Sequence, residues 1–333
     1  MKKRILITGA SGFIGSFVVE EALRRGFDTW AAIRHTSSTR YLKHPDIRLI
    51  ELDLGDPERL QRQLAAPDAP WDVVVHCAGA TQCIDPADFD RHNYDATRHL
   101  VEALQASGRT PAQFIYLSSL SVFGPIHETD YAPITDHDQP RPNTAYGRSK
   151  RKTELFLQRH ESLPYVIFRP TGVYGPRERD YFLMAQSISR HVDFAAGFRR
   201  QDLTFVYVKD LVQAIFRAID HGTTRRCYFV SDGRTYDSRA FSDLIRNELG
   251  NPWMVRFTCP LGLLKVLSWV AEKTAALAGK SSTLNRDKYR IMKQRNWRCD
   301  IAPLQADLGY QPEYPLERGV EEAIAWYKKE GWL

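Results

Sequence analysis

The sequence predicts an α/β protein built on a parallel sheet. Short apolar runs that read as buried strands alternate with helical patterns through about residue 175. The first run, residues 2–8, has a basic start and ends in a turn rich in glycine, and a helical pattern follows it. At 333 residues the chain is long enough for a substantial core and, we expect, for a second lobe.

The turn after the first strand carries Gly9, Gly12 and Gly15 in the pattern Gly-x-x-Gly-x-x-Gly. Glycines at a strand-to-helix turn let the backbone approach a pyrophosphate, which then lies at the helix N-terminus. The pattern therefore predicts a doubly wound, dinucleotide-binding sheet of the Rossmann type. The basic residues 2–4 would also suit a signal peptide, but the apolar stretch is short, contains glycines and has no clear cleavage site.

The second strand is predicted at residues 29–33, and Arg34 follows it directly. Folds that prefer NAD usually carry an acidic residue about 20 residues after the glycine motif, where it binds the ribose 2′-hydroxyl. Here Ile33 takes the place of that acid. A guanidinium with the hydroxyl residues 36–38 nearby suits a 2′-phosphate, so we expect NADP(H) as the cofactor, with NAD(H) as the alternative. An ordinary surface arginine is the competing interpretation.

A later apolar run, residues 114–117, reads as a buried strand that ends in Ser118 and Ser119. In open parallel sheets, ligands bind outside the carboxyl ends of the strands. Tyr146 and Lys150 follow, and residues at this spacing lie on the same face of a helix. We expect the ammonium to lower the pKa of the phenol, so that the pair can move a proton on and off a substrate oxygen while hydride moves at the neighbouring carbon.

The same spacing recurs at Tyr289 and Lys293. No strand of this kind precedes Tyr289, whose neighbours are largely basic. We therefore predict a surface helix there rather than a second site.

Taken together, these motifs resemble the extended short-chain dehydrogenase/reductase superfamily, with its NAD(P)-dependent epimerases and dehydratases. The resemblance covers essentially the whole chain and implies that Ser119, Tyr146 and Lys150 are catalytic. It also implies a homodimer. The cofactor-binding residues that it implies are Thr8, Gly9, Ser11, Gly12, Phe13, Ile14, Gly15, Arg34, Asp53, Leu54, Cys77, Ala78, Gly79, Asn93, Ser118, Tyr146, Lys150, Pro170, Thr171, Gly172 and Val173.

The two lobes are expected to interleave along the chain. Residues 1–175 would form the NADP(H)-binding Rossmann domain, to which strands at 203–208 and 226–230 return. The smaller, discontinuous C-terminal substrate lobe would then comprise residues 176–202 and 231–333.

One clue to the substrate is the residue at position 203. Nucleotide-sugar enzymes of the superfamily place a diphosphate-binding arginine where this chain has Leu203. Loss of that bidentate ligand disfavours a diphosphate substrate. Arg199 and Arg200 lie nearby and could compensate.

The other clue is the apolar segment 260–279. Read as a helix, it places Lys265, Ser268 and Glu272 on one polar stripe, and its charges make it a poor membrane span. Three interpretations of this segment remain open: an ordinary lobe helix, a helix over an apolar substrate pocket, and a helix in a membrane interface. The segment resembles the 3β-hydroxysteroid dehydrogenase and dihydroflavonol reductase branch, as do residues 297–300, 308–312 and 326–327.

Composition limits the partners. The net charge is +6, but lysine and arginine are spread along the chain without a nucleic-acid motif, so we expect no nucleic acid. The five cysteines and ten histidines form no metal-ligand spacing, so we expect no metal. A reduced, cytoplasmic chain is the simplest expectation, with membrane contact through 260–279 as an option.

The sequence thus predicts an NADP(H)-dependent oxidoreductase of lipid metabolism that interconverts a ketone and an alcohol on a fairly apolar, lipid- or sterol-like substrate. The alternative is a nucleotide-sugar epimerase, dehydratase or reductase. A third option is a catalytically silent nucleotide sensor, and the intact Ser119, Tyr146 and Lys150 argue against it.

Overall fold

The computed structural model describes residues 2–277, 279, 282 and 284–333. Seven strands form one parallel sheet in the order β10-β6-β5-β4-β1-β2-β3. The strands are β1 (Arg4–Thr8), β2 (Asp28–Ile33), β3 (Arg48–Glu51), β4 (Val73–His76), β5 (Gln113–Leu117), β6 (Tyr165–Pro170) and β10 (Arg226–Val230). This order, which reverses direction beside β1, is that of the doubly wound fold and confirms the predicted α/β class.

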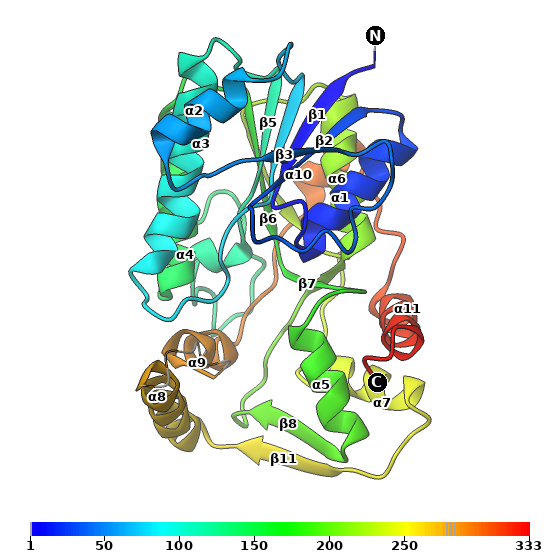
Figure 1. The fold of residues 1–333 in the computed structure, drawn as a ribbon. Coiled ribbons are helices and arrows are strands. Elements are labelled where there is room, and N and C mark those ends of the chain that lie inside the picture. The colour runs from blue at the N-terminus through cyan, green and yellow to red at the C-terminus, as the bar shows by residue number, and fades with distance from the viewer. Residues whose placement is uncertain (1, 278, 280–281, 283) are drawn as a thin grey trace.

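Helices cover both faces of the sheet, as Figure 1 shows. One face packs against α1 (Phe13–Arg24), α6 (Val208–Asp220) and α10 (Ala302–Leu308). The other packs against α2 (Pro57–Ala65), α3 (Ala96–Ala106) and α4 (Ala145–Arg159). Because the central strands are buried on both sides, their side chains are apolar in continuous runs rather than in alternation.

Two strand pairs lie outside the large sheet. β7 (Gly172–Tyr174) pairs in parallel with β9 (Phe205–Tyr207), and β8 (Val192–Ala196) pairs in parallel with β11 (Val255–Cys259). The expectation that residues 203–208 return to the main sheet is therefore wrong, whereas 226–230 do return as β10. An apolar run predicts a strand but does not name the strand that it pairs with.

The remaining helices gather below the sheet in Figure 1. They are α5 (Asp180–Ser189), α7 (Ala240–Glu248), α8 (Leu261–Leu277), α9 (Arg286–Lys293) and α11 (Leu316–Lys329). Most of the apolar segment 260–279 is helix α8, and its residue 278 lies outside the described residues. The assignment of these segments to a substrate lobe stays a prediction.

The resemblance of residues 297–300 implies a strand, but the structure has only an isolated bridge there, between Ile134 and Cys299. A further feature without a sequence signal is η1 (Asp90–Asp95), a short π-helix that leads into α3. Within the described residues, no helix is long and apolar enough to cross a membrane.

Candidate active site

The glycine turn between β1 and α1 has a backbone that only glycine can adopt without a clash. Gly9 has φ +64°, and a Cβ on it would lie 2.7 Å from the amide nitrogen of Ala78. A Cβ on Gly15 would lie 2.2 Å from the carbonyl oxygen of Gly9. Helix α1 begins after Gly12 without a side-chain cap. Its first N–H groups are therefore available to an anion, which fits the pyrophosphate of a dinucleotide.

A chain of hydrogen bonds joins the ends of β1 and β4 beside this turn. The Thr97 hydroxyl donates to the Asn93 carbonyl oxygen (2.6 Å), so its oxygen is left to accept from His76 Nε2 (3.0 Å). His76 Nδ1 then accepts from the Thr8 hydroxyl (2.7 Å), whose oxygen accepts from Ala78 N (3.3 Å). This order requires a neutral His76, and burial together with the charge of Lys150 lowers its pKa to about 3.

Asn93 fastens the loop after β4 to helix α4. Its side-chain oxygen accepts from Ala80 N (2.8 Å), and its Nδ2 donates to Ala80 O (3.1 Å) and Ser149 Oγ (2.9 Å). A Cβ on Gly79 would meet Asn93 Oδ1 at 2.8 Å and Lys150 Nζ at 3.3 Å. Gly79, Asn93 and Lys150 therefore meet at one point, which explains why a glycine is needed there.

The other cofactor-side residues after β4 are Cys77 and Ala78. Cys77 is partly buried, and burial raises the pKa of its thiol to about 12. The cysteine therefore stays a neutral thiol and serves as packing at the strand end. Among the described residues, no group of three or more His, Cys, Asp or Glu is placed to hold a metal ion.

Tyr146 and Lys150 lie in the first turns of α4, as the spacing predicts. Thr144 caps this helix by accepting from Gly147 N (2.9 Å). Lys150 is buried; its Nζ donates to Leu117 O (2.8 Å) and lies 6.0 Å from the centre of the Tyr146 ring. The structure thus brings the ammonium of α4 to the carboxyl end of β5.

The pKa shifts of this pair correct one expectation. Burial raises the pKa of Tyr146 to about 12, and a hydrogen bond with Ser119 lowers it only in part. Burial lowers the pKa of Lys150 to about 8, against the pull of Cys77 and Glu154. The predicted lowering of the tyrosine pKa is therefore not seen in this structure, because desolvation by burial outweighs the hydrogen bond with Ser119.

The two serines after β5 differ in their surroundings. Ser119 caps the short helix η2 (Leu120–Val122), and its Oγ accepts from Ser121 N (3.1 Å). Ser118 is buried, and its hydroxyl donates to Glu154 Oε1 (2.6 Å). The structure therefore brings the Ser119 hydroxyl to Tyr146 but directs that of Ser118 into the interior.

Glu154 is the centre of a buried charge cluster that the sequence analysis missed. Arg169 donates to both of its carboxylate oxygens, from Nε and from Nη2, each at 3.0 Å. Arg151 adds a further contact to it at 3.2 Å. Both Glu154 and Arg169 are buried. Burial alone would lower the pKa of Arg169, but the attraction of Glu154 outweighs it and raises that pKa. The cluster joins α4 to β5 and β6.

Residues 170–173 continue from Arg169 at the end of β6. Thr171 N donates to Val230 O (3.1 Å), which holds this turn to β10. A Cβ on Gly172 would lie 2.4 Å from the Tyr181 hydroxyl. Pro170 is buried and Val173 packs partly on the core, so the turn has little freedom beside the carboxyl ends of the strands.

At the other end of the expected cofactor site, Arg34 follows β2 and is exposed. Ser37 Oγ accepts from its backbone N–H (3.0 Å), and its guanidinium has no ion-pair partner among the described residues. Asp53 is engaged locally, with Gly55 N (3.0 Å) and Arg59 Nη1 (3.6 Å). Leu54 O accepts from His99 Nδ1 (2.9 Å). Among the described residues, Arg34 is thus an unpaired charge at this edge.

Helix α9 also contacts helix α4, which the sequence did not indicate. Asp287 Oδ2 accepts from Ala145 N (2.6 Å) and Tyr146 N (3.4 Å), at the N-terminus of α4. The carboxylate lies where a negative charge stabilises a helix. Tyr289, on the same helix, packs partly against the cluster around Leu264. It is therefore less exposed than the charge pattern predicts, although α9 has no fully buried residue.

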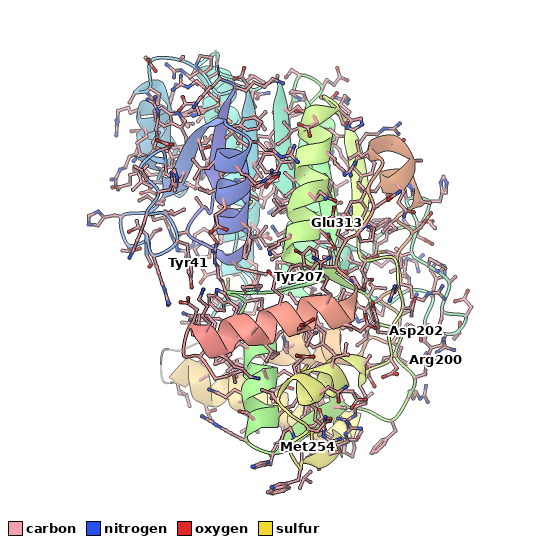
Figure 2. The ribbon with its side chains drawn as sticks, turned by 90° about the vertical axis from the view of Figure 1, so that its right-hand side faces the viewer. Tyr41, Arg200, Asp202, Tyr207, Met254 and Glu313 are labelled. Atoms are coloured by element: carbon pink, nitrogen blue, oxygen red, sulfur yellow. The ribbon has the colours of Figure 1, made fainter. Side chains whose placement is uncertain are left out.

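Leu203, which stands at the position of the diphosphate-binding arginine of nucleotide-sugar enzymes, makes an apolar contact. Leu203 exchanges backbone hydrogen bonds with Tyr236. It also packs partly on the apolar core formed between α5, α7 and α11. Arg200 makes a bidentate pair with Asp202, at 2.7 and 2.8 Å, and Figure 2 shows the two at the edge of the molecule. Arg200 is therefore already neutralised, and Arg199 is exposed.

Comparison with known proteins decides the family. Residues 5–230 match the model of the NAD dependent epimerase/dehydratase family. The chain belongs to this family. Its members are NAD(P)-dependent epimerases, dehydratases and dehydrogenases of the extended short-chain dehydrogenase/reductase type, so the predicted superfamily, enzyme class and NAD(P) binding are confirmed.

Members of the family with different names resemble the chain to similar degrees. The UDP-glucose 4-epimerase of Vibrio cholerae is 27% identical, over 97% of this chain and 94% of its own. The ceramide reductase of Caulobacter vibrioides is 23% identical, over 99% and 96%. The crystal structure of a UDP-glucose 4-epimerase from Thermotoga maritima with UDP-glucose superposes with a TM-score of 0.79, at 21% identity and over 98% and 99% of the chains. This last likeness establishes the fold alone.

Proposed function

We propose that this oxidoreductase uses NADP(H) to interconvert a ketone and an alcohol on a fairly apolar, lipid- or sterol-like substrate. The observation that carries the proposal is the apolar contact at Leu203, with the nearby Arg200 already bound to Asp202. A diphosphate needs cationic partners, because a buried and poorly paired charge is costly. An apolar substrate needs none, since burial of its surface contributes about 25 cal/mol per Å².

The proposed roles follow from the site geometry. Tyr146 gives its proton to the carbonyl oxygen of the ketone, and with a pKa near 12 it carries that proton at neutral pH. Lys150, as an ammonium, stabilises the tyrosinate that remains. Ser119 donates a hydrogen bond to the same substrate oxygen. The nicotinamide of a dinucleotide whose pyrophosphate lies at the glycine turn would supply the hydride.

The substrate class is tested by turnover and binding together. Purified protein is given NADPH with long-chain or polycyclic ketones, and separately with UDP- and GDP-sugars. We expect oxidation of NADPH by the apolar ketones and no thermal shift with the sugar nucleotides. Tight binding of a UDP-sugar, with epimerisation, would contradict the proposal.

The preference for NADP(H) rests on Arg34, which ends β2 without a carboxylate partner among the described residues. A charge-assisted hydrogen bond contributes about 1.5–3 kcal/mol, or roughly ten- to a hundredfold in affinity. Arg34→Ala should therefore weaken NADPH by that factor and leave NADH nearly unchanged, as measured by calorimetry. Arg40→Ala is the control, because Arg40 is paired with Glu330. Equal affinity of the parent protein for both cofactors would overturn the preference.

A nucleotide-sugar epimerase, dehydratase or reductase is the second candidate. The printed names of the Vibrio cholerae relative and the Thermotoga maritima structure support it. On that function Arg199, which is exposed, would be the phosphate ligand. Arg199→Ala and Arg200→Ala would then each be assayed for lost binding of the sugar nucleotide.

A further inference from the structure

Helix α8 directs polar side chains toward the protein and apolar side chains toward solvent. Its inner side carries Leu264 and Ser268, both buried, and the Ser268 hydroxyl has to donate back to Leu264 O. The polar stripe continues to Glu272, which binds the backbone and side chain of Arg286 on α9. The residues on the outer side are apolar and exposed: Leu263, Val266, Leu267, Trp269 and Val270. A surface helix normally has the reverse arrangement.

The strand pair β8–β11 repeats the inversion. Val192 and Phe194 on β8, and Val255 and Phe257 on β11, alternate with polar residues and are exposed. The polar residue between the first two, Asp193, is 2% exposed. It pairs inward with Arg239 at 2.8 Å and Arg256 at 3.4 Å.

Two loop aromatics extend the same surface. Phe198 follows β8 and is 76% exposed, and Trp253 precedes β11 and is 68% exposed. Pro260 alone separates β11 from α8, so strand pair and helix are continuous. Figure 1 shows β8, β11 and α8 together at the end of the molecule opposite the large sheet, and Figure 2 shows Met254, next to Trp253, at that end. We call this surface the apolar end.

The unpaired charges on the described segments of the apolar end are of one sign. Exposed cations stand on its segments 190–200 and 253–277: Arg190, Arg199, Lys265 and Lys273. None of the four has an ion-pair partner among the described residues. The acids of the same segments, Asp193 and Glu272, are both paired with arginines. The surface therefore offers exposed apolar and aromatic side chains with unneutralised positive charge beside them.

We propose that the apolar end docks in the interface of an anionic lipid bilayer. Apolar and aromatic side chains on one side, with lysine and arginine beside them, are the pattern of interfacial membrane binding. Anionic headgroups complement the cations. A second copy of the chain fits less well, because a two-fold contact would set the same cations against each other.

The apolar end is connected to helix α4. Helix α8 is tied to α9 through Glu272 and Arg286, and the next residue, Asp287, caps α4 at Tyr146. A membrane-bound α8 is therefore linked through two contacts to the start of α4, which carries Tyr146. The docking itself does not depend on the identity of the substrate.

The full-length protein is tested by flotation with vesicles of phosphatidylcholine and phosphatidylglycerol in equal parts, and with vesicles of phosphatidylcholine alone. We expect binding to the anionic vesicles that weakens as salt is raised. Phe198→Ser with Trp253→Ser, and separately Val266→Asp with Val270→Asp, should reduce the bound fraction about tenfold or more. The side chains are exposed, so folding is checked by an unchanged melting temperature and NADPH-induced thermal shift.

Further variants separate the contribution of the cations from that of the apolar side chains. Lys265→Glu with Lys273→Glu should weaken binding to the anionic vesicles only. Leu49→Ser, an exposed leucine on β3 in the main sheet, should change nothing. Failure of the parent protein to float with anionic vesicles would overturn the proposal. So would binding that survives both apolar variants, or self-association that the same variants abolish in the absence of vesicle binding. None of these outcomes depends on catalysis, so they leave the proposed function to its own test.

Discussion

At the scale of single residues, burial moves the pKa values of Tyr146 and Lys150 in opposite directions. The phenol has a pKa of about 12 and the ammonium of about 8. The values favour a neutral phenol that can donate its proton, next to a cation that can stabilise the resulting tyrosinate. Reduction of a carbonyl uses the pair in this state.

The first prediction concerns the proton. Tyr146→Phe should lower turnover by about 10²–10⁴-fold, the usual contribution of a general acid or base, with NADPH affinity largely retained. Tyr289→Phe, at the other Tyr-x-x-x-Lys spacing, should have turnover near that of the parent protein. Steady-state kinetics and cofactor titration measure both variants. Turnover of Tyr146→Phe within a few-fold of the parent would refute the role.

The second prediction concerns pH. Below a pKa of about 8 Lys150 is an ammonium, and above it the amine is neutral and can no longer stabilise a tyrosinate. Turnover in the reducing direction should therefore fall as pH rises through about 8. Tyr146, with a pKa near 12, stays protonated over this range and adds no second loss. Lys150→Arg is the matched control, since a guanidinium keeps its charge and should remove this inflection. A flat profile between about pH 7 and 9 would contradict the assignment.

At the scale of elements, the N-terminus of α4 is stabilised from two sides. Thr144 caps it from within the chain, and Asp287 reaches it from α9. Neither the glycine motif nor the Tyr-x-x-x-Lys spacing indicates the second contact, because its partners are far apart in sequence. The start of α4 therefore depends on a helix from the C-terminal part of the chain.

Removal of that contact gives a third prediction. Asp287→Ala should lower the free energy of unfolding by about 1 kcal/mol, as for loss of a helix cap. It should also lower kcat more than it raises KM, because Tyr146 is at the capped end. Asp180→Ala is the control. Asp180 forms an exposed ion pair with Lys288, which lies on α9 as Asp287 does, and loss of this pair should lower the free energy of unfolding by less than about 0.5 kcal/mol. Urea denaturation and steady-state kinetics make the comparison; equal effects of the two variants would argue against a positioning role.

At the scale of the whole molecule, the sequence predicted the fold class because the glycine turn and the apolar runs are local signals. Gly9 and Gly15 are recognisable from spacing alone, and the structure gives each a steric reason. The strand with which another strand pairs was not predictable from sequence. Residues 205–207 form a strand, but it pairs with β7 rather than with the main sheet.

The candidate site was predictable in part for the same reason. Tyr146, Lys150 and Asn93 fall together in space as their motifs suggest. The hydrogen bonds that set the state of His76, the π-helix at 90–95 and the buried Glu154 are products of tertiary packing. The pKa of Tyr146 was misjudged because sequence gives the nearby cation but not the extent of burial.

The pair of Glu154 and Arg169 has a consequence for how this chain can change over generations. Loss of either partner alone breaks the bidentate pair and leaves a buried charge with a weaker partner, Arg151 for Glu154 or the partly exposed Asp136 for Arg169, at a cost of up to about 3–5 kcal/mol. Such a cost is a large part of the whole stability of a domain, so most lineages with a single replacement would be eliminated. Replacement of both by apolar residues can be nearly neutral, but it requires passage through one of the costly single states. Substitutions at the two positions should therefore occur together, and a relative that lacks one member of the pair should lack the other.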